Sequence, residues 1–289
     1  MQIDKYILLN AGGTTRKGFM EGLPNARYES YRSKELLLHV AENGDIFFVH
    51  KNTPVDFKNA YVFTRLRATD AHFCGMLYEY FAHVGIPASD PINRSFPYSA
   101  EKITQMLLLP LNNIRIPETL VFREESYETN REYVSTHMHF PIVFKTDGSK
   151  GRNVHVVHTQ DELDEIMKRK RPFKLALVQP FIENTYDTRT LVAYGEILGS
   201  IKRTRTQGYL NNIAQGAVPS LHTLTDIERD TAIRATSVCG MDFAGVDMIH
   251  TPKGPIVLEV NKSPQVHGFE SVHNFKVFKK IAELIGEKF

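Results

Sequence analysis

A short apolar stretch near the C-terminal end, residues 255–264, constrains the fold of this chain more than any other. It begins as a β-strand and then breaks its apolar pattern at Glu259 and Asn261. Alternate residues of a strand point to the same face, so these two side chains lie together. A second strand-like run, residues 244–250, comes just before it, and a Pro- and Gly-containing connection predicts that the two form a β-hairpin.

The register of this hairpin decides which polar groups meet. We expect His250 to pair with Ile256, which places Asp247 opposite Glu259. A slip of one residue would turn Asp247 to the other face of the sheet and separate it from Glu259.

Asp247, Glu259 and Asn261 then offer three oxygen donors on one face. Hard oxygen ligands suit Mg²⁺, which keeps open positions for phosphate and water. A surface hairpin with solvated acids is the alternative for a lone pair of carboxylates. The apolar surroundings of Glu259 and the amide two residues later favour the metal site.

The whole chain has the composition of a globular protein that can divide into two or three lobes over its 289 residues. Its 35 Lys and Arg residues against 33 Asp and Glu give a formal charge of +2, too small to favour nucleic acid as the main partner. Cys74 and Cys239 lack metal-ligand spacing, which indicates reduced, buried thiols. With no membrane-length apolar run and no apolar leader, we expect a cytoplasmic protein without membrane contact.

Residues 140–151 form the second informative stretch. A buried-looking strand ends on Lys145, and a loop of small residues that carries Lys150 follows before the next strand. Such a hairpin can fold over phosphates with backbone N–H groups and an ammonium as donors, although an ordinary hairpin has the same pattern. The spacing of a P-loop is absent.

Other local signals place helices and strand ends. Thr159 and Thr225 each precede a glutamate by three residues, a capping box that opens a helix. Pro180 lies within the strand-like run 175–182, which predicts an edge strand or the end of a ladder. A strand end there leaves backbone groups that can recognise an adenine edge. Arg65 and Arg67 follow an early strand, where they face an anionic ligand or form a surface pair.

Several of these stretches, in this order, resemble the ATP-grasp superfamily and within it the RimK-like amino-acid ligases. The matching segments are residues 141–145, 148–151, 177–182, 187–189, 212–216, 245–247 and 259–264. The resemblance implies an α/β and α+β architecture with ATP held between the last two domains. We expect an N-terminal α/β domain over residues 1–97, a central lid over 98–182 and a C-terminal α+β domain with the metal site over 183–289.

The resemblance also implies roles for individual residues. Arg203 and Lys145 would be catalytic, since they would neutralise charge at the transferring phosphate. Asp247, Glu259 and Asn261 would hold Mg²⁺, or Mn²⁺ in its place. ATP would be bound by a set of residues from the lid and the adjoining strands: Lys102, Lys145, Ser149, Gln179, Pro180, Phe181, Ile182, Asp187, Asn211 and Asn212.

The implied activity is an ATP-dependent ligase that joins a carboxylate to an amine through an acyl-phosphate. Its partners would be an amino acid such as glutamate and an acid, peptide or protein acceptor, and the resemblance also implies a homo-oligomer. An ATP-binding scaffold without ligase activity is one alternative, because residues 262–265 depart from the family pattern. A kinase on the same fold is another. For the ligase, we expect Glu259→Ala and Arg203→Ala to fold without turning over.

Overall fold

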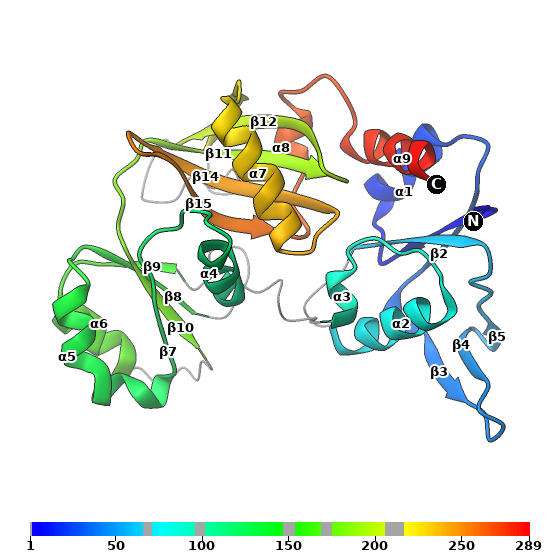
Figure 1. Cartoon of the computed structure of the whole chain (residues 1–289), viewed down its shortest axis with the longest axis horizontal. Helices are drawn as coiled ribbons and strands as arrows, with labels where there is room; N and C mark the ends of the chain where they lie inside the picture. The colour runs from blue at the N-terminus through cyan, green and yellow to red at the C-terminus, as the bar shows by residue number, and fades with distance from the viewer. Residues whose placement is uncertain (1, 66–70, 96–101, 147–153, 169–174, 206–216) are drawn as a thin grey trace.

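The structure is a computed structural model, and it describes residues 2–65, 71–95, 102–146, 154–168, 175–205 and 217–289. Within these residues the chain forms three groups of strands with their covering helices, following one another along the sequence (Figure 1). No helix in the described ranges is long and apolar enough to cross a membrane.

The N-terminal part contains a parallel sheet of order β2-β1-β6 and a small antiparallel sheet of order β3-β4-β5. Its elements are β1 (Lys5–Leu9), α1 (Gly13–Gly22), β2 (Arg27–Tyr31), β3 (Leu37–Val40), β4 (Ile46–His50), β5 (Thr53–Pro54), β6 (Ala60–Thr64), α2 (Ala71–Val84) and α3 (Ile92–Ser95).

Both faces of the parallel sheet are covered, which explains why β1 and β6 are buried throughout. Ile7 and Val62 pack with residues of α2 such as Leu77. Tyr6 and Phe63 pack on the other side with α1 and with the last helix of the chain, α9 (Val277–Lys288). Helices α1 and α9 therefore lie against each other, and the two ends of the chain meet there (Figure 1).

The middle part contains an antiparallel sheet of order β7-β10-β8-β9. Its elements are α4 (Lys102–Leu111), β7 (Leu120–Phe122), α5 (Tyr127–His137), β8 (Ile142–Thr146), β9 (Val154–Val157), α6 (Gln160–Lys168) and β10 (Ala176–Pro180). Helices α5 and α6 cover one face, where Tyr127, Val134 and Leu163 pack on Phe144 and Val178. Because side chains alternate along a strand, Lys145 and Gln179 project from the opposite face.

Helix α4 packs with the third sheet although it precedes the second one in sequence. Met106 and Leu109 join a core with Ala232 and Val260 of that sheet and its helix. The Gln105 side chain accepts a hydrogen bond from the Val260 N–H at 2.9 Å and donates one to its carbonyl at 2.7 Å. These bonds satisfy backbone groups at the outer edge of the sheet.

The C-terminal part contains the largest sheet, antiparallel and of order β13-β12-β11-β14-β15. Its elements are β11 (Tyr186–Ala193), β12 (Glu196–Thr204), β13 (Val218–Leu221), α7 (Asp226–Val238), β14 (Phe243–Thr251), β15 (Gly254–Asn261), α8 (His267–Glu270) and α9. Helix α7 covers one face, where Ala232 and Ala235 pack on Val246 and Met248. The opposite face carries the residues at positions 187, 189, 203 and 247, which build the candidate site.

Candidate active site

The β14–β15 hairpin brings the expected metal ligands together, but through a register that the sequence did not reveal. Its turn is tighter than expected: His250 pairs with Pro255, so the expected pairing with Ile256 is wrong. A bulge then leaves Leu258 without a partner on β14, and this extra residue restores the alignment. Asp247 consequently lies opposite Glu259, as expected from the sequence.

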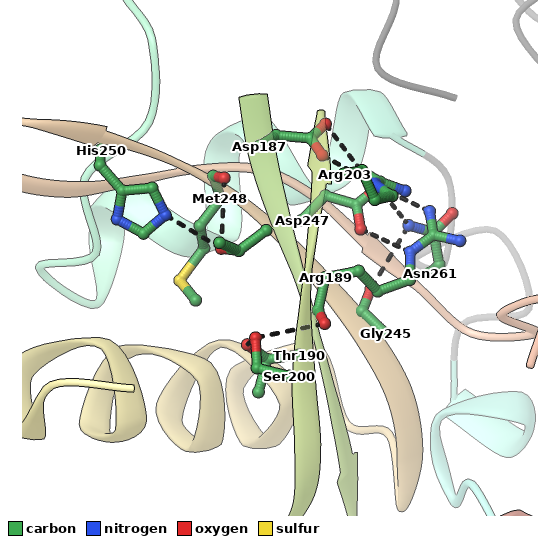
Figure 2. Close-up of polar contacts among 11 residues, drawn as sticks. Asp187, Arg189, Thr190, Ser200, Arg203, Gly245, Asp247, Met248, His250 and Asn261 are labelled. Carbon is green, nitrogen blue, oxygen red and sulfur yellow. Dashed lines mark hydrogen bonds and ion pairs between the residues drawn. The ribbon is translucent and has the colours of Figure 1, made fainter. Parts of the chain in front are cut away.

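Asp247 is the centre of the site and is held by two arginines (Figure 2). Arg189, its neighbour on β11, donates to both carboxylate oxygens at 2.7 Å, and the Arg203 guanidinium lies 3.1 Å from Oδ2. Burial by itself would raise the pKa of Asp247, but the adjacent guanidinium groups of Arg189 and Arg203 outweigh it and hold that pKa below its usual range. Asp247 is therefore an ionised carboxylate at neutral pH, as a metal ligand must be.

Arg203 is fixed by a second acid on the neighbouring strand. Asp187 lies opposite it in the β11–β12 register and accepts two hydrogen bonds, at 2.6 and 2.7 Å. Both side chains are buried, with Arg203 only 4% exposed. Burial raises the pKa of Asp187, and Arg203 offsets part of that rise. Asp187 thus positions Arg203, while its expected contact with the nucleotide stays a prediction.

Asn261 completes the donor set. Its Nδ2 donates to the Gly245 carbonyl and to Asp247 Oδ2, each at 3.3 Å. The amide is thereby oriented, and its Oδ1 is the atom left for a cation. Two carboxylates and an amide oxygen form a ligand set that fits Mg²⁺, or Mn²⁺, better than a softer metal.

Lys145 and Gln179 meet on the free face of the second sheet. The Lys145 ammonium donates to Gln179 Oε1 at 2.6 Å. Gln179 is 2% exposed and anchored through its Nε2, which donates to Thr119 Oγ1 at 2.9 Å and lies 3.3 Å from Met106 Sδ. Gln179 is therefore placed to orient the ammonium of Lys145. Its expected position beside the adenine of ATP stays a prediction.

The remaining expected nucleotide ligands are only partly described. Pro180 ends β10, which lies between β7 and β8, so it marks the end of a ladder and not an edge strand. The Phe181 N–H donates to the Pro141 carbonyl at 2.9 Å, and Ile182 follows it, half-buried. Lys102 begins α4. Ser149, Asn211 and Asn212 lie outside the described residues.

Two further cationic side chains, Arg65 and Lys262, lie where the C-terminal part of the chain contacts the N-terminal part. Arg65 donates through Nη2 to the Pro264 carbonyl at 3.3 Å, and its guanidinium carbon lies 5.0 Å from the centroid of the Phe278 ring. Its Nη1 is buried and has no hydrogen-bond partner within the described residues. Lys262 is directed instead to Asn93 of α3, to which its ammonium donates. Lys262, which stands where the family often has a small residue, thus connects the C-terminal part of the chain to α3 of the N-terminal part.

We expect Gln179→Leu to weaken nucleotide binding because it removes the group that holds the Lys145 ammonium. At metal sites, loss of the hydrogen-bond partner that orients a ligand lowers affinity by about 10-fold to 100-fold, and we expect a loss of ATP affinity of this order here. Titration of ATP by calorimetry measures the effect, and Gln160→Leu, which removes an amide from the helix-covered side of the same domain, is the matched control. Equal ATP affinity in wild type and Gln179→Leu would contradict the orienting role.

The arrangement of sheets and helices is that of known ATP-grasp ligases. A structure of the ATP-grasp ligase PsnB, complexed with a phosphomimetic variant of a minimal precursor, Mg and ADP, superposes with a TM-score of 0.72 at 14% identity, covering 100% of both chains. A RimK domain ATP-grasp protein from Sphaerobacter thermophilus gives a TM-score of 0.66 at 20% identity, covering 96% of this chain and 98% of that one. The chain therefore has the ATP-grasp fold.

The sequence narrows this class to one family. Residues 99–285 match the RimK-like ATP-grasp domain, so the chain belongs to that family. A probable alpha-L-glutamate ligase of Syntrophotalea carbinolica is 31% identical over 192 residues, 65% of this chain and 63% of that protein. The ribosomal protein bS6–L-glutamate ligase of Salmonella paratyphi B is 29% identical, over 68% of this chain and 67% of that protein. Another probable alpha-L-glutamate ligase, from Shewanella pealeana, is matched over only 50% of its length.

Proposed function

We propose that this chain is an ATP- and Mg²⁺-dependent ligase that joins a carboxylate to an amine. The observation that carries the proposal is the pairing of Asp247 with Glu259 across the hairpin, beside Asn261 and the buried Arg203. Family membership and the fold supply the context, since ligases of this fold have been crystallised with Mg and ADP.

The proposed reaction has two steps. A substrate carboxylate oxygen attacks the γ-phosphorus of ATP, the bond to the β-phosphate oxygen breaks, and ADP leaves. An amine nitrogen then attacks the carbonyl carbon of the acyl-phosphate, loses a proton and expels phosphate. The product is an amide, with one ATP converted to ADP and phosphate.

The residues of the chain serve this reaction by positioning and by charge. When bound, Mg²⁺ neutralises the phosphate oxygens, and Asp247, Glu259 and Asn261 would hold it. Arg203 presents a fixed positive charge without reorganising, because Asp187 and the surrounding sheet hold it in place. Lys145 adds a second positive charge from β8 of the β7-β10-β8-β9 sheet. Preorganised charges of this kind are the main source of catalysis in phosphoryl transfer.

For the substrates, we propose glutamate or a similar amino acid and a peptide or protein acceptor. The names of the relatives and of PsnB, which is complexed with precursor peptides, support this choice. So does Arg65, whose buried Nη1 lacks a partner within the described residues and borders the Pro264 loop. Arg189 and Arg203 are committed to aspartates, so they are poorer candidates for an acidic substrate. A homo-oligomer and a cytoplasmic location stay predictions.

The test is ADP release measured with each amino acid, with and without carboxylate and peptide acceptors, followed by mass spectrometry of the product. We expect ADP release to require both a carboxylate and an amine, and the product mass to equal their sum less one water. ATP binding without ADP formation across the panel would favour a scaffold. A phosphorylated product formed without amine would favour a kinase.

A further inference from the structure

A second cluster of ligand-type side chains lies on the opposite face of the C-terminal sheet from the candidate active site. It consists of His222, just after β13, Glu228 in the first turn of α7, and His250 near the end of β14. One ligand atom from each side chain lies within 4.8 Å of the others. Figure 2 shows His250 on the other side of the strands from the Asp187–Arg203 pair.

The cluster is held in place by Glu228. This carboxylate is 5% exposed and closes the capping box of α7, accepting the Thr225 N–H at 2.7 Å. Its Oε1 lies 2.6 Å from His250 Nδ1, and its Oε2 lies 3.3 Å from His222 Nε2. Both histidine side chains are about one-fifth exposed, at 19% and 21%, so the cluster is open to solvent on one side.

We propose that His222, Glu228 and His250 form a binding site for a divalent transition metal, with Zn²⁺ the best-fitting ion. Two imidazoles and one carboxylate, without sulfur, are a ligand set that Zn²⁺ accepts in tetrahedral sites with water in the fourth position. Bonds of roughly 2.0–2.1 Å in a tetrahedron place neighbouring ligand atoms about 3.3 Å apart. The separation of His222 and Glu228 already matches that spacing.

The second nitrogen of His250 supports a ligand role. Metal-binding histidines donate their other N–H to a fixed acceptor, which sets the ring orientation. His250 Nε2 lies 3.1 Å from Thr188 Oγ1, and that hydroxyl can donate onward to the Met248 carbonyl at 3.4 Å. The tautomer with the proton on Nε2 leaves Nδ1, the atom that faces Glu228, free to bind a cation.

The competing explanation for the 2.6 Å contact is an ordinary hydrogen bond, in which a proton on His250 Nδ1 is donated to Glu228 Oε1. Lys202 lies near it, with its ammonium 4.0 Å from the centroid of the Tyr186 ring that stacks on His250. If that hydrogen bond is the whole explanation, His222, Glu228 and His250 bind no metal. At the metal site, the cation replaces that proton and links β14, α7 and the segment after β13 on the face away from the active site.

The test uses the full chain, freed of metal with a chelator and kept in excess Mg²⁺ so that the oxygen site does not take up the probe. Co²⁺ is added and its visible absorption recorded, and Zn²⁺ is then titrated in competition. We expect one equivalent of Co²⁺ with the strong absorption of a four-coordinate site, displaced by Zn²⁺. We expect His222→Ala to weaken Zn²⁺ binding by more than the roughly 100-fold that loss of an outer hydrogen-bond partner can cost.

Matched variants keep the result interpretable. His222 lies outside the helices and strands, so its replacement leaves the capping box of α7 intact. Thr188→Val keeps all three ligands and is expected to weaken Zn²⁺ binding about 10-fold, whereas the exposed His39→Ala is expected to change nothing. Wild-type protein that binds no Co²⁺ or Zn²⁺ under these conditions, or His222→Ala that binds Zn²⁺ as tightly as wild type, would overturn the proposal.

Discussion

Glu259→Ala is expected to fold normally and to lower the rate of ADP formation by about 100-fold or more. The side chain is half-buried on the open face of the hairpin, opposite Asp247, so its loss removes charge from the site without opening a core. With one carboxylate gone, Mg²⁺ binding weakens and the phosphate charge is less well neutralised at the transition state. Steady-state ADP release over a range of Mg²⁺ concentrations measures both effects.

The matched control is Glu196→Ala, an exposed glutamate at the start of β12 in the same sheet. This substitution also removes one negative charge, but at a position outside the site, and it should leave ADP formation unchanged. Normal turnover in Glu259→Ala, at the Mg²⁺ concentration that suits wild type, would show that Glu259 is not a ligand of the essential metal.

Arg203→Ala is expected to have two effects, on stability and on turnover. The sequence alone predicted a folded, inactive variant, but the structure buries Arg203 between Asp187 and Asp247. Removing one partner of a buried ion pair leaves an uncompensated charge, which typically costs about 3–5 kcal/mol of the free energy of unfolding. We therefore expect a clear loss in urea-unfolding stability together with a loss of turnover of about 100-fold or more.

A second variant separates these two effects. Asp187→Asn combined with Arg203→Met removes the buried acid and the guanidinium together, so much of the stability should return. Turnover should stay low, because the positive charge near the phosphates is still missing. If the double variant regained ADP formation along with stability, Arg203 would be a structural residue without a catalytic role.

The hairpin illustrates how much of the site the sequence predicts. The period of two along the strand placed Glu259 and Asn261 on one face, and the apolar run before them marked the strand itself. Asp247 was correctly placed opposite Glu259, yet the expected turn was wrong, and the bulge at Leu258 compensated. Apolar residues on both sides of a bulge give no sign of which one lacks a partner, so that detail depends on the folded sheet.

Side-chain pairs between neighbouring strands were the part that local patterns could not predict. Nothing in the local pattern indicated that Arg189 pairs with Asp247 and that Arg203 pairs with Asp187, as the structure shows. Both pairings follow from the register between β11 and its two neighbours, which pattern alone does not specify. The capping boxes at Thr159 and Thr225, by contrast, are local signals, and their N-cap hydroxyls accept the expected backbone bonds.

The histidine cluster shows the same limit. Glu228 was recognised only as the glutamate of a capping box, and that role is confirmed. Its second set of contacts depends on His222 and His250, which arrive from a different strand and a loop. The spacing of these three residues along the chain matches no local metal-binding motif, so only the packing of α7 on the sheet brings them together.

A crystal structure with a non-hydrolysable ATP analogue and Mn²⁺ tests the central claim most directly, because anomalous scattering locates Mn²⁺ without ambiguity. We predict Mn²⁺ bound by oxygens of Asp247, Glu259 and Asn261 and in contact with the phosphates. Ordered nucleotide with Mn²⁺ bound by neither Asp247 nor Glu259 would contradict the proposed ligase site.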